Sequence, residues 1–464
     1  MLLAPGLPAA PQTSLPAPVN RILVQNKLPE SAVSAFVQRV GSTEPLLAFN
    51  EDVPRNPASV MKLVTTFAAL EALGPVYQWK TEVYADGRIN QGVLAGDLIL
   101  KGYGDPYLVT ERLWLLQREL RQRGLRDIDG DIVIDNSWFA REELDPGAFD
   151  GQEYRAYNAL PDALLVNFQA VNFTFRPDAA RGRVEISTDP VLANLDIQNK
   201  MRLFRGSCGS SKSGISMVVG NTAPRPRVTF SGALASQCAE YQLLRSVLDG
   251  PAYAYGAFRG LWEEQGGRIA GGPRQGQVPD GKSPFLTFQS PALAEVIRSV
   301  NKYSNNVMTR QLFLTLGAEK FGPPGTVEKG ARAVEAALAA RGLRFPELNA
   351  GNGAGLARES RISAASLGEL LLAAHASPFQ PEFSASLSIA GLDGTTRKRF
   401  LADPVAGDMH LKTGTLNGVT SIAGFVHSQS GAEYAVVMVV NGPKATWGGG
   451  IEAQNALLRW VHQR

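Results

Sequence analysis

The spacing of hydrophobic residues predicts helices near both ends of the chain. From Val60 to Leu73, apolar residues recur at intervals of three and four positions until Gly74 ends the run, which predicts a buried helix that begins near Ser59. The pattern of Pro29–Gln38 is also compatible with a helix. Similar spacing predicts further helices over residues 291–303, 306–316, 326–341 and 445–462.

The middle of the chain has a different pattern, because short apolar runs alternate there with Gly, Asp and Pro. Between about residues 85 and 282 this pattern predicts one or two β-rich modules. The turn residues of Gly271–Gly281 predict a linker at the end of this region. Other strands are expected at residues 45–50, 408–412, 420–427 and 433–441.

Length and composition favour a folded protein of two or three domains. The chain has 464 residues, of which 44% are hydrophobic and 19% are charged, as in ordinary globular proteins. The net charge of +3 is too small for a nucleic-acid partner held by counterion release, and it gives little force to attraction by a membrane surface. No apolar run approaches the roughly 18 residues of a membrane span, so no transmembrane segment is predicted.

Two cysteines, Cys208 and Cys238, lie in one stretch that is rich in Ser and Gly. None of the four histidines is near them in the sequence, and no other spacing typical of metal ligands occurs, so neither a metal nor a cofactor is expected. A disulfide that closes a loop of about thirty residues is the favoured interpretation. A pair of buried thiols is the alternative.

The first ten residues lack the basic start and the full apolar stretch of an intact signal peptide. They could be the end of such a peptide with a start Met added. Together with the expected disulfide, this favours an exported protein that is soluble or loosely attached to a membrane.

Ser59-Val-Met-Lys62 places a serine and a lysine three positions apart on the predicted helix. Residues at this spacing face the same side, so the Lys62 nitrogen can reach the Ser59 hydroxyl. A lysine that is partly desolvated beside other cations can lose its proton and activate a serine, and the helix N-terminus favours an oxyanion. The same spacing recurs in Ser299-Val-Asn-Lys302, so the favoured interpretation of one copy alone is an ordinary helix-capping serine with an exposed lysine.

Two further triplets distinguish the first copy. Ser304-Asn-Asn306 has the form S-x-N, and Lys412-Thr-Gly414 has the form K-T-G at the end of a predicted strand. The order S-x-x-K, S-x-N, K-T-G is typical of penicillin-recognising serine enzymes. Lys212-Ser-Gly214 is a competing triplet, but it precedes every S-x-N sequence and so breaks this order.

The segments around these motifs resemble the type-4, class C low-molecular-mass penicillin-binding proteins, which are D-alanyl-D-alanine carboxypeptidases and endopeptidases of peptidase family S13. The resemblance covers nearly the whole chain after about residue 20. The segments that carry it are Asn56–Thr66, Asn301–Asn306, Gly353–Leu356, Arg361–Ser363, Ala390–Arg399, His410–Leu416 and Asn441–Gly442.

The resemblance implies an α/β (α+β) fold in which a transpeptidase or serine β-lactamase-like domain, an antiparallel sheet flanked by helices, is split by an insertion. Residues 20–84 and 283–464 would form this domain. The β-rich insertion would form one or two further domains, with 85–180 and 245–282 as the second domain and 181–244 as the third. Both cysteines would lie in the insertion.

The resemblance also implies roles for the motif residues. Ser59 would be the nucleophile and Lys62 its general base. Ser304 would pass the proton to the leaving amine, and Lys412 would keep Lys62 partly deprotonated. Asn306 would hydrogen-bond the substrate amide. The segment Thr413, Gly414 and Thr415 would bind the substrate carboxylate, and the backbone N–H groups of Ser59 and Thr415 would form the oxyanion hole.

Five other positions have separate interpretations. Family members carry an acid in the insertion that binds the free amino group of diaminopimelate, and Asp150 and Glu153 are the candidates, with a solvated loop acid as the alternative. His410 shares a strand face with Lys412 and would either edge the cleft or be an ordinary core or surface histidine. The sequence departs from the family at Asn305, where Asp is common, and at Ala354, where Ser is usual.

Three hypotheses for function follow. The first is a peptidoglycan DD-carboxypeptidase and DD-endopeptidase of the periplasm or cell envelope, which acts on peptides that end in D-Ala-D-Ala, cleaves D-Ala-meso-diaminopimelate cross-links and is covalently inhibited by β-lactam antibiotics. The second is a serine β-lactamase or esterase on the same scaffold. The third is a non-enzymatic penicillin-binding or wall-scaffolding protein, which the complete set of Ser, Lys and Asn residues disfavours.

Overall fold

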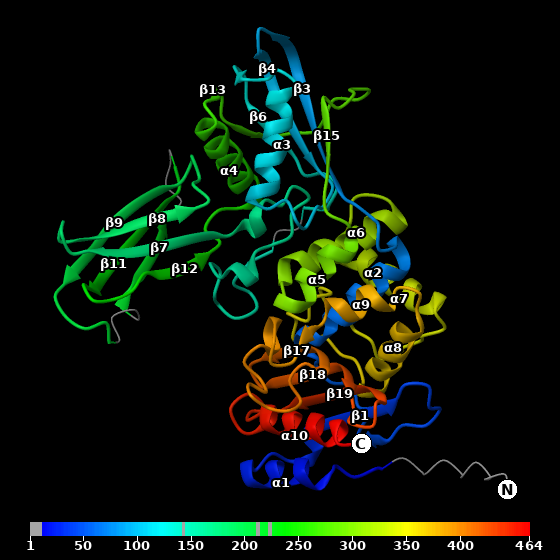
Figure 1. Cartoon of the computed structure of the whole chain (residues 1–464). Helices are drawn as coiled ribbons and strands as arrows, with labels where there is room; N and C mark the ends of the chain where they lie inside the picture. Colours follow the sequence, from blue (N-terminus) through cyan, green and yellow to red (C-terminus); the bar gives the residue numbers. More distant parts are fainter. Residues whose placement is uncertain (1–11, 142–143, 210–213, 221–224) are drawn as a thin grey trace, which may run out of the picture. The chain divides into compact units, whose positions relative to one another are not determined.

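The computed structural model describes residues 12–141, 144–209, 214–220 and 225–464, which form two compact units (Figure 1). The split unit contains the chain up to Gln78 together with Pro291–Arg464, and the inserted unit is Trp79–Ser290. These limits lie a few residues outside those expected at 84 and 283, because β3 (Lys80–Asn90) pairs with β15 (Leu286–Gln289) within the inserted unit. The N-terminal decapeptide and Lys212 lie outside the described residues.

The split unit is built on one six-stranded sheet in which every pair of neighbours is antiparallel. Its two central strands are buried along almost their whole length, because helices cover both faces of the sheet. The strand order is β16 (Ser388–Ile389), β17 (Met409–Leu416), β18 (Val419–His427), β19 (Glu433–Asn441), β1 (Val33–Arg39) and β2 (Leu47–Phe49).

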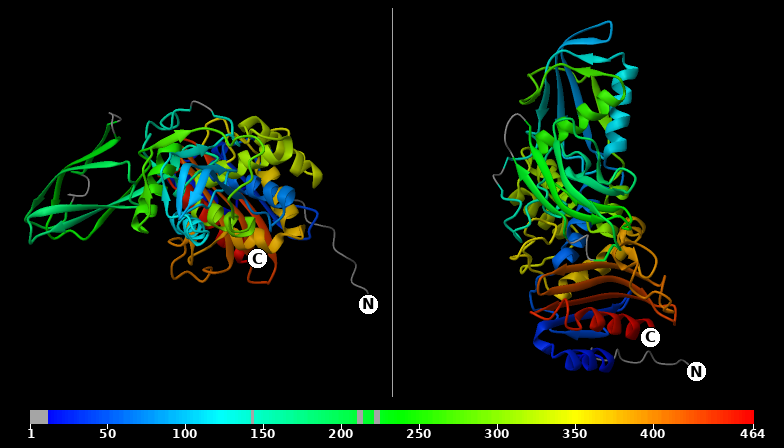
Figure 2. Two further views of the ribbon diagram at one scale, coloured as in Figure 1. Left: turned by 90° about the horizontal axis from the view of Figure 1, so that it is seen from above. Right: turned by 90° about the vertical axis from the view of Figure 1, so that its left-hand side faces the viewer.

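Figures 1 and 2 show the helices on the two faces of this sheet. On one face, α1 (Ala17–Asn26) and α10 (Gly450–His462) pack together and share an apolar core with the strands. On the other face, α8 contacts β1 and β19, and α2 lies among the remaining helices. These helices are α2 (Met61–Leu73), α5 (Leu293–Tyr303), α6 (Asn306–Phe321), α7 (Val327–Ala340), α8 (Ala364–Ala376) and α9 (Gln380–Ser386). The predicted antiparallel sheet flanked by helices is confirmed.

The helix expected over Pro29–Gln38 is wrong, since this segment forms a short 3-10 turn followed by β1. Every residue of β1 except Arg39 is buried. A strand buried on both faces loses the alternation of polar and apolar positions that identifies strands in a sequence. The spacing of its apolar residues therefore resembled that of a helix.

The inserted unit contains a mixed seven-stranded sheet with two helices that the sequence pattern did not predict. The strand order is β13-β5-β4-β3-β15, with β6 joined to both β4 and β14. The remaining bounds are β4 (Val93–Gly102), β5 (Asp127–Ile128), β6 (Ile132–Asp135), β13 (Arg268–Ile269), β14 (Pro273–Gln275), α3 (Thr110–Gln122) and α4 (Gly250–Glu264). Because β14 pairs with β6, the segment expected to be a linker is partly a strand.

Two three-stranded sheets complete the inserted unit, in the orders β12-β7-β8 and β10-β11-β9. Their faces meet where the ring of Phe230 contacts Phe173 and Phe175 at centroid distances of 4.9 and 5.0 Å. The limit expected at residue 180 falls between β7 and β8, which pair with each other, so the proposed third domain would need to include β7. The strand bounds are β7 (Val171–Asp178), β8 (Arg183–Asp189), β9 (Asp196–Phe204), β10 (Ser216–Gly220), β11 (Arg227–Ala235) and β12 (Tyr241–Arg245).

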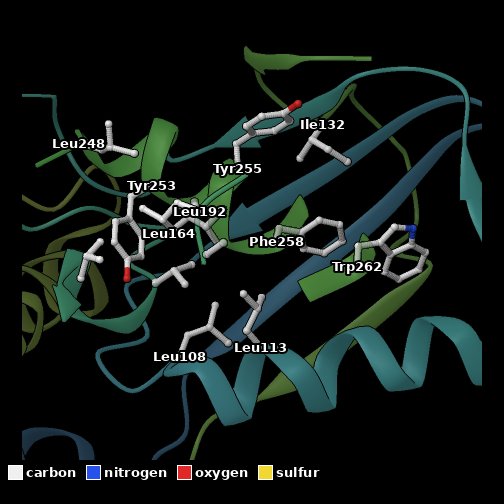
Figure 3. Close-up of a cluster of buried hydrophobic side chains, with 14 of the residues drawn as sticks. Leu108, Leu113, Ile132, Leu164, Leu192, Leu248, Tyr253, Tyr255, Phe258 and Trp262 are labelled. Atoms are coloured by element: carbon white, nitrogen blue, oxygen red, sulfur yellow. The ribbon is translucent and has the colours of Figure 1, made fainter. Parts of the chain in front are cut away.

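One hydrophobic cluster joins the parts of the inserted unit. Figure 3 shows Tyr253, Phe258 and Trp262 of α4 among leucines that include Leu108 and Leu113. The same cluster includes Phe173, Phe175 and Phe230 of the two small sheets. Cys208 and Cys238 form the predicted disulfide within this unit. Among the helices that the structure describes, none is both long and apolar enough to cross a membrane.

Candidate active site

Ser59 lies in a tight turn at the start of a buried helix, as its position in the sequence predicted. The turn is the 3-10 segment Ala58–Val60, which leads directly into α2. Ala58 has a φ of 46°, a backbone conformation that L residues rarely adopt. The side-chain oxygen of Asn56 accepts a hydrogen bond from the Ala58 N–H at 2.8 Å, which stabilises this turn and leaves Ser59 half-buried at the head of the helix.

Lys62 is fully buried, and its nitrogen has three oxygen neighbours. It lies 3.0 Å from Ser59 Oγ, 2.7 Å from Asn306 Oδ1 and 2.6 Å from the backbone oxygen of Ala354. The last two atoms can only accept hydrogen bonds, whereas the serine hydroxyl can also donate one. An ammonium can donate to all three oxygens, whereas a neutral amine can donate to Asn306 and Ala354 and accept from the Ser59 hydroxyl.

The electrostatic surroundings of Lys62 favour its neutral form. Burial lowers the pKa of Lys62 well below its ordinary value, and the positive charges of Lys412 and Arg310 lower it further. Arg310 lies one helical turn after Asn306 on α6. The sequence pattern did not identify Arg310, because an arginine in the middle of a helix carries no motif.

Ser304 and Lys412 form a second pair. The Lys412 nitrogen donates to Ser304 Oγ at 2.9 Å and to the backbone oxygen of Thr413 at 2.7 Å. Ser304 ends α5 in the left-handed conformation, with a φ of 57°. Lys412 is fully buried, and this burial lowers its pKa to about 7. A buried cation whose pKa is near neutrality can change its charge over the physiological pH range.

The departure from the family pattern at Asn305 has a local explanation. Asn305 is the N-cap of α6, and its side-chain oxygen accepts a hydrogen bond from the Met308 N–H at 3.1 Å. Asn and Asp are similarly good N-cap residues, so this exchange preserves the start of the helix. Asn306, the third residue of the triplet, is left to contact Lys62.

Strand β17 passes directly beside the turn that holds Ser59. A Cβ atom at Gly414 would lie 2.6 Å from the Pro57 oxygen and 2.9 Å from the Ser59 nitrogen, so only glycine allows this approach. Ser421 on β18 donates to the Pro57 oxygen at 2.5 Å and fixes the same contact from the neighbouring strand. Thr413 is partly exposed and Thr415 is exposed on the two sides of Gly414.

Gly414→Ala is expected to reduce kcat/KM about a hundredfold or more, because the added methyl group pushes β17 away from the Ser59 N–H and weakens one side of the expected oxyanion hole. Steady-state hydrolysis of a D-Ala-D-Ala peptide measures the effect. Gly272→Ala is the matched control, since a Cβ there meets no atom within 4 Å. Equal activities for the two variants would contradict the expected role of this contact.

Two asparagines far apart in the chain brace the segment before Ser59. The Asn56 N–H donates to Asn441 Oδ1 at 2.9 Å, and Asn441 Nδ2 donates to the Asn56 oxygen at 3.0 Å. Both residues lie in the segments that carry the family resemblance, but nothing in their local sequence indicates that they meet. The pair fixes the end of β19 to the turn that holds Ser59.

The Gly353–Gly355 segment contacts Lys62 and the Ser59 turn through backbone atoms rather than side chains. The Ala354 oxygen accepts from Lys62, and a Cβ at Gly355 would lie 1.8 Å from the Ala58 oxygen. The contact to Lys62 is independent of the residue type at position 354, so the replacement of the usual serine by alanine preserves it.

The second S-x-x-K sequence has a structural role. Lys302 is buried, and its nitrogen binds Asp393 Oδ2 at 2.5 Å and the Leu387 oxygen at 2.7 Å. The Nδ1 atom of His410 lies 3.2 Å from the backbone oxygen of Ser384, and the role of this histidine stays a prediction.

Asp150 and Glu153 lie in an exposed part of the inserted unit. Burial alone would raise the pKa of Asp150, but hydrogen bonds from Tyr157 and Asn158 hold it below its usual value. Asp150 therefore already organises its own loop. The role of either acid toward a substrate amine stays a prediction.

The chain matches the model of the D-Ala-D-Ala carboxypeptidase 3 (S13) family over residues 15–463. It is 29% identical to a D-alanyl-D-alanine carboxypeptidase of Actinomadura sp. (strain R39), over 93% of this chain and 81% of that protein. It is 27% identical to the D-alanyl-D-alanine carboxypeptidase DacB of Haemophilus influenzae, over 92% of this chain and 90% of that protein.

The fold agrees with these matches. The crystal structure of penicillin binding protein 4 (dacB) from Haemophilus influenzae superposes with a TM-score of 0.79 at 23% identity, over 96% of this chain and 99% of that one. The family match extends over both units and includes every motif that carries the resemblance in the sequence. The chain therefore belongs to the D-Ala-D-Ala carboxypeptidase 3 (S13) family.

Proposed function

We propose that the protein is a serine-type D-alanyl-D-alanine carboxypeptidase and DD-endopeptidase of the periplasm or cell envelope, which trims and un-crosslinks peptidoglycan stem peptides through an acyl-enzyme. The observation that carries the proposal is the contact between Lys62 and Ser59, in which a buried amine has acceptors for both of its protons and a hydroxyl for its lone pair. Family membership supports the substrate class, and the disulfide supports an exported protein.

The reaction would begin when Ser59 Oγ attacks the carbonyl carbon of the penultimate D-alanine and Lys62 takes the hydroxyl proton. The Ser59 and Thr415 N–H groups would stabilise the oxyanion. As the C–N bond breaks, Ser304 would pass the proton to the departing amine. Water would then attack the acyl-enzyme carbonyl and restore the proton of Ser59.

Substrate binding would use the groups around this centre. Asn306 would hydrogen-bond the substrate amide. Because Asn306 also accepts a hydrogen bond from Lys62, it would place the substrate beside the general base. Thr413 and Thr415 would bind the terminal carboxylate together with the positive charge of Lys412. A β-lactam carries an amide and a carboxylate in similar positions, so it would acylate Ser59 in the same way. The Haemophilus influenzae relative has been solved in complex with a β-lactam.

Three assays on the purified protein test the proposal. Free D-alanine released from a pentapeptide measures carboxypeptidase activity, cleavage of cross-linked peptide dimers measures endopeptidase activity, and nitrocefin hydrolysis measures β-lactamase activity. We expect release of D-alanine and dimer cleavage with slow nitrocefin turnover. Fast nitrocefin turnover without peptide cleavage would instead identify a β-lactamase on the same scaffold.

The pH profile follows from the two lysines. Acylation needs neutral Lys62 and charged Lys412, so kcat/KM is expected to rise with pH as Lys62 loses its proton and to fall again above about pH 7 as Lys412 loses its own. A bound carboxylate favours the charged form of Lys412, so kcat should persist to higher pH than kcat/KM.

Stopped-flow acylation by a chromogenic β-lactam and peptide hydrolysis from pH 5 to 10 measure these profiles. Lys412→Arg, which stays charged throughout, should remove the alkaline decline of kcat/KM even where its maximum is lower. An unchanged alkaline decline in this variant would contradict the role of Lys412.

A further inference from the structure

Thr395 places a second hydroxyl group beside the strand expected to bind the substrate carboxylate. Thr413 Oγ1 donates to Thr395 Oγ1 at 2.8 Å, and both side chains reach solvent. Thr395 belongs to the 3-10 turn Gly394–Thr396, which no catalytic motif includes. Its position next to Thr413 therefore calls for a physical explanation.

The turn that carries Thr395 is fixed by close backbone contacts. Gly394 has a φ of 56°, and a Cβ there would lie 2.2 Å from Ser388 Oγ and 2.7 Å from the Lys302 oxygen, so only glycine fits. The Thr395 N–H donates to Ser388 Oγ at 3.2 Å. Ser388 begins β16, which pairs with β17, so the turn is held in register with Thr413.

An ion pair between a buried lysine and a partly exposed aspartate fixes the other side of the turn. Lys302 is only 4% exposed in its side chain and binds Asp393, whose other oxygen accepts from the Ile389 N–H at 2.7 Å. Lys302 lies in the last turn of α5, two residues before Ser304. Asp393 is 34% exposed, but loss of its charge would leave the buried Lys302 uncompensated, so the pair favours one position of the turn. The ion pair thus links the helix that presents Ser304 to the turn that presents Thr395.

The chemistry of a carboxylate suits two hydroxyl groups. Each ionised carboxylate has two oxygens and about four acceptor positions, whereas one threonine hydroxyl supplies one proton. Without substrate, Thr395 accepts the proton of Thr413, so the Thr395 proton can be donated onward. When a carboxylate binds, the Thr413 hydroxyl can rotate and donate to it instead, so each threonine supplies one proton. Ser388 Oγ, 3.4 Å away, is at the limit of hydrogen bonding and is a weak competitor for it.

We propose that the Thr395 hydroxyl donates a hydrogen bond to the terminal carboxylate of the substrate beside Thr413, and that the Lys302–Asp393 ion pair positions it; the inference rests on the carboxypeptidase function proposed above. Thr395 is then a specificity-determining residue, because its contribution exists only for leaving groups that carry a carboxylate. Lys302 and Asp393 are positioning residues.

Two thioesters with the same D-alanyl acyl group test the inference. One has thioglycolate as its leaving group and so carries a free carboxylate, and the other has the methyl ester of thioglycolate. Thr395→Val removes the hydroxyl at nearly constant shape. We expect this variant to lower kcat/KM for the free acid about tenfold to a hundredfold, because one charge-assisted hydrogen bond is lost. The kcat/KM for the methyl ester should be unchanged.

Two other variants sharpen the comparison. Thr395→Ser keeps the hydroxyl and should keep the wild-type ratio of the two kcat/KM values. Thr43→Val, at an exposed threonine between β1 and β2, is the matched control and should leave both values unchanged. The inference is wrong if Thr395→Val changes kcat/KM equally for both thioesters or for neither of them. It is also wrong if Thr395→Ser departs from the wild-type ratio of the two kcat/KM values.

Asp393→Asn tests the positioning role. The amide oxygen can still accept from the Ile389 N–H, but the charge opposite Lys302 is lost. We expect a lower unfolding temperature. We also expect a fall in the ratio of kcat/KM for the free acid to kcat/KM for the methyl ester. A lower unfolding temperature with the wild-type ratio would contradict the positioning role. If the wild-type protein hydrolyses neither thioester, the proposed function itself fails, which separates that outcome from failure of the inference.

Discussion

Ser59→Ala is expected to abolish covalent labelling by a fluorescent penicillin and to reduce peptide hydrolysis roughly a million-fold, since the atom that forms the acyl-enzyme is missing. The other contacts to Lys62 remain, because Asn306 and Ala354 still accept from its nitrogen. The variant should therefore fold normally and still bind substrate. Gel fluorescence after labelling and release of D-alanine measure the two losses.

The chain provides a matched control for this experiment in Ser299→Ala. Ser299 is the first residue of the second S-x-x-K sequence, whose lysine binds Asp393 instead of activating a serine. Ser299→Ala should be labelled at the wild-type rate. Labelling that survives in Ser59→Ala would mean that another residue is the nucleophile.

Lys62→Arg is expected to slow acylation about 10²- to 10⁴-fold, the range typical of general-base catalysis. Arginine keeps the hydrogen-bond donors and the positive charge, but it stays protonated at all accessible pH values and cannot take the Ser59 proton. A purely structural lysine would tolerate this exchange much better. Stopped-flow acylation by a chromogenic β-lactam measures the rate directly.

Lys320→Met, which removes an exposed lysine from α6, serves as the control for loss of a surface charge and should acylate at the wild-type rate. Thermal unfolding of Lys62→Arg reports whether the larger side chain disturbs the buried position. Near-normal acylation by a folded Lys62→Arg protein would contradict the role of Lys62 as the base.

The sequence predicted those parts of the site that depend on local spacing. Ser59 and Lys62 are three residues apart on one helix, and periodicity identifies that helix directly. The order of the triplets made Ser304, Asn306 and Lys412 candidates, and the family resemblance supplied their expected roles. Their contacts with one another depend on long-range packing, which periodicity does not report.

The parts that were missed share a physical cause. Asn56 and Asn441 meet across 385 positions, and the Ala354 contact uses a backbone oxygen, so neither leaves a local signal. Strand β1 is buried on both faces, so its sequence lacks the alternation of polar and apolar residues that marks a strand. Helix α4 is buried around most of its surface, so it lacks the polar face that marks a helix within a β-rich stretch.

The antiparallel pairing of β1 with β19 has a consequence for the order of folding. Val33 pairs with Val440, so the central sheet joins residues from the two ends of the chain. During synthesis, β2 follows β1 directly, but β19, the other neighbour of β1, emerges only after the whole inserted unit. Such long-range pairing carries a large loop-closure entropy and forms slowly. The inserted unit can bury its own core earlier, so Ser59 and Lys62 would acquire their reactive environment only once the C-terminal strands have arrived. Activity would then begin as the last step of maturation.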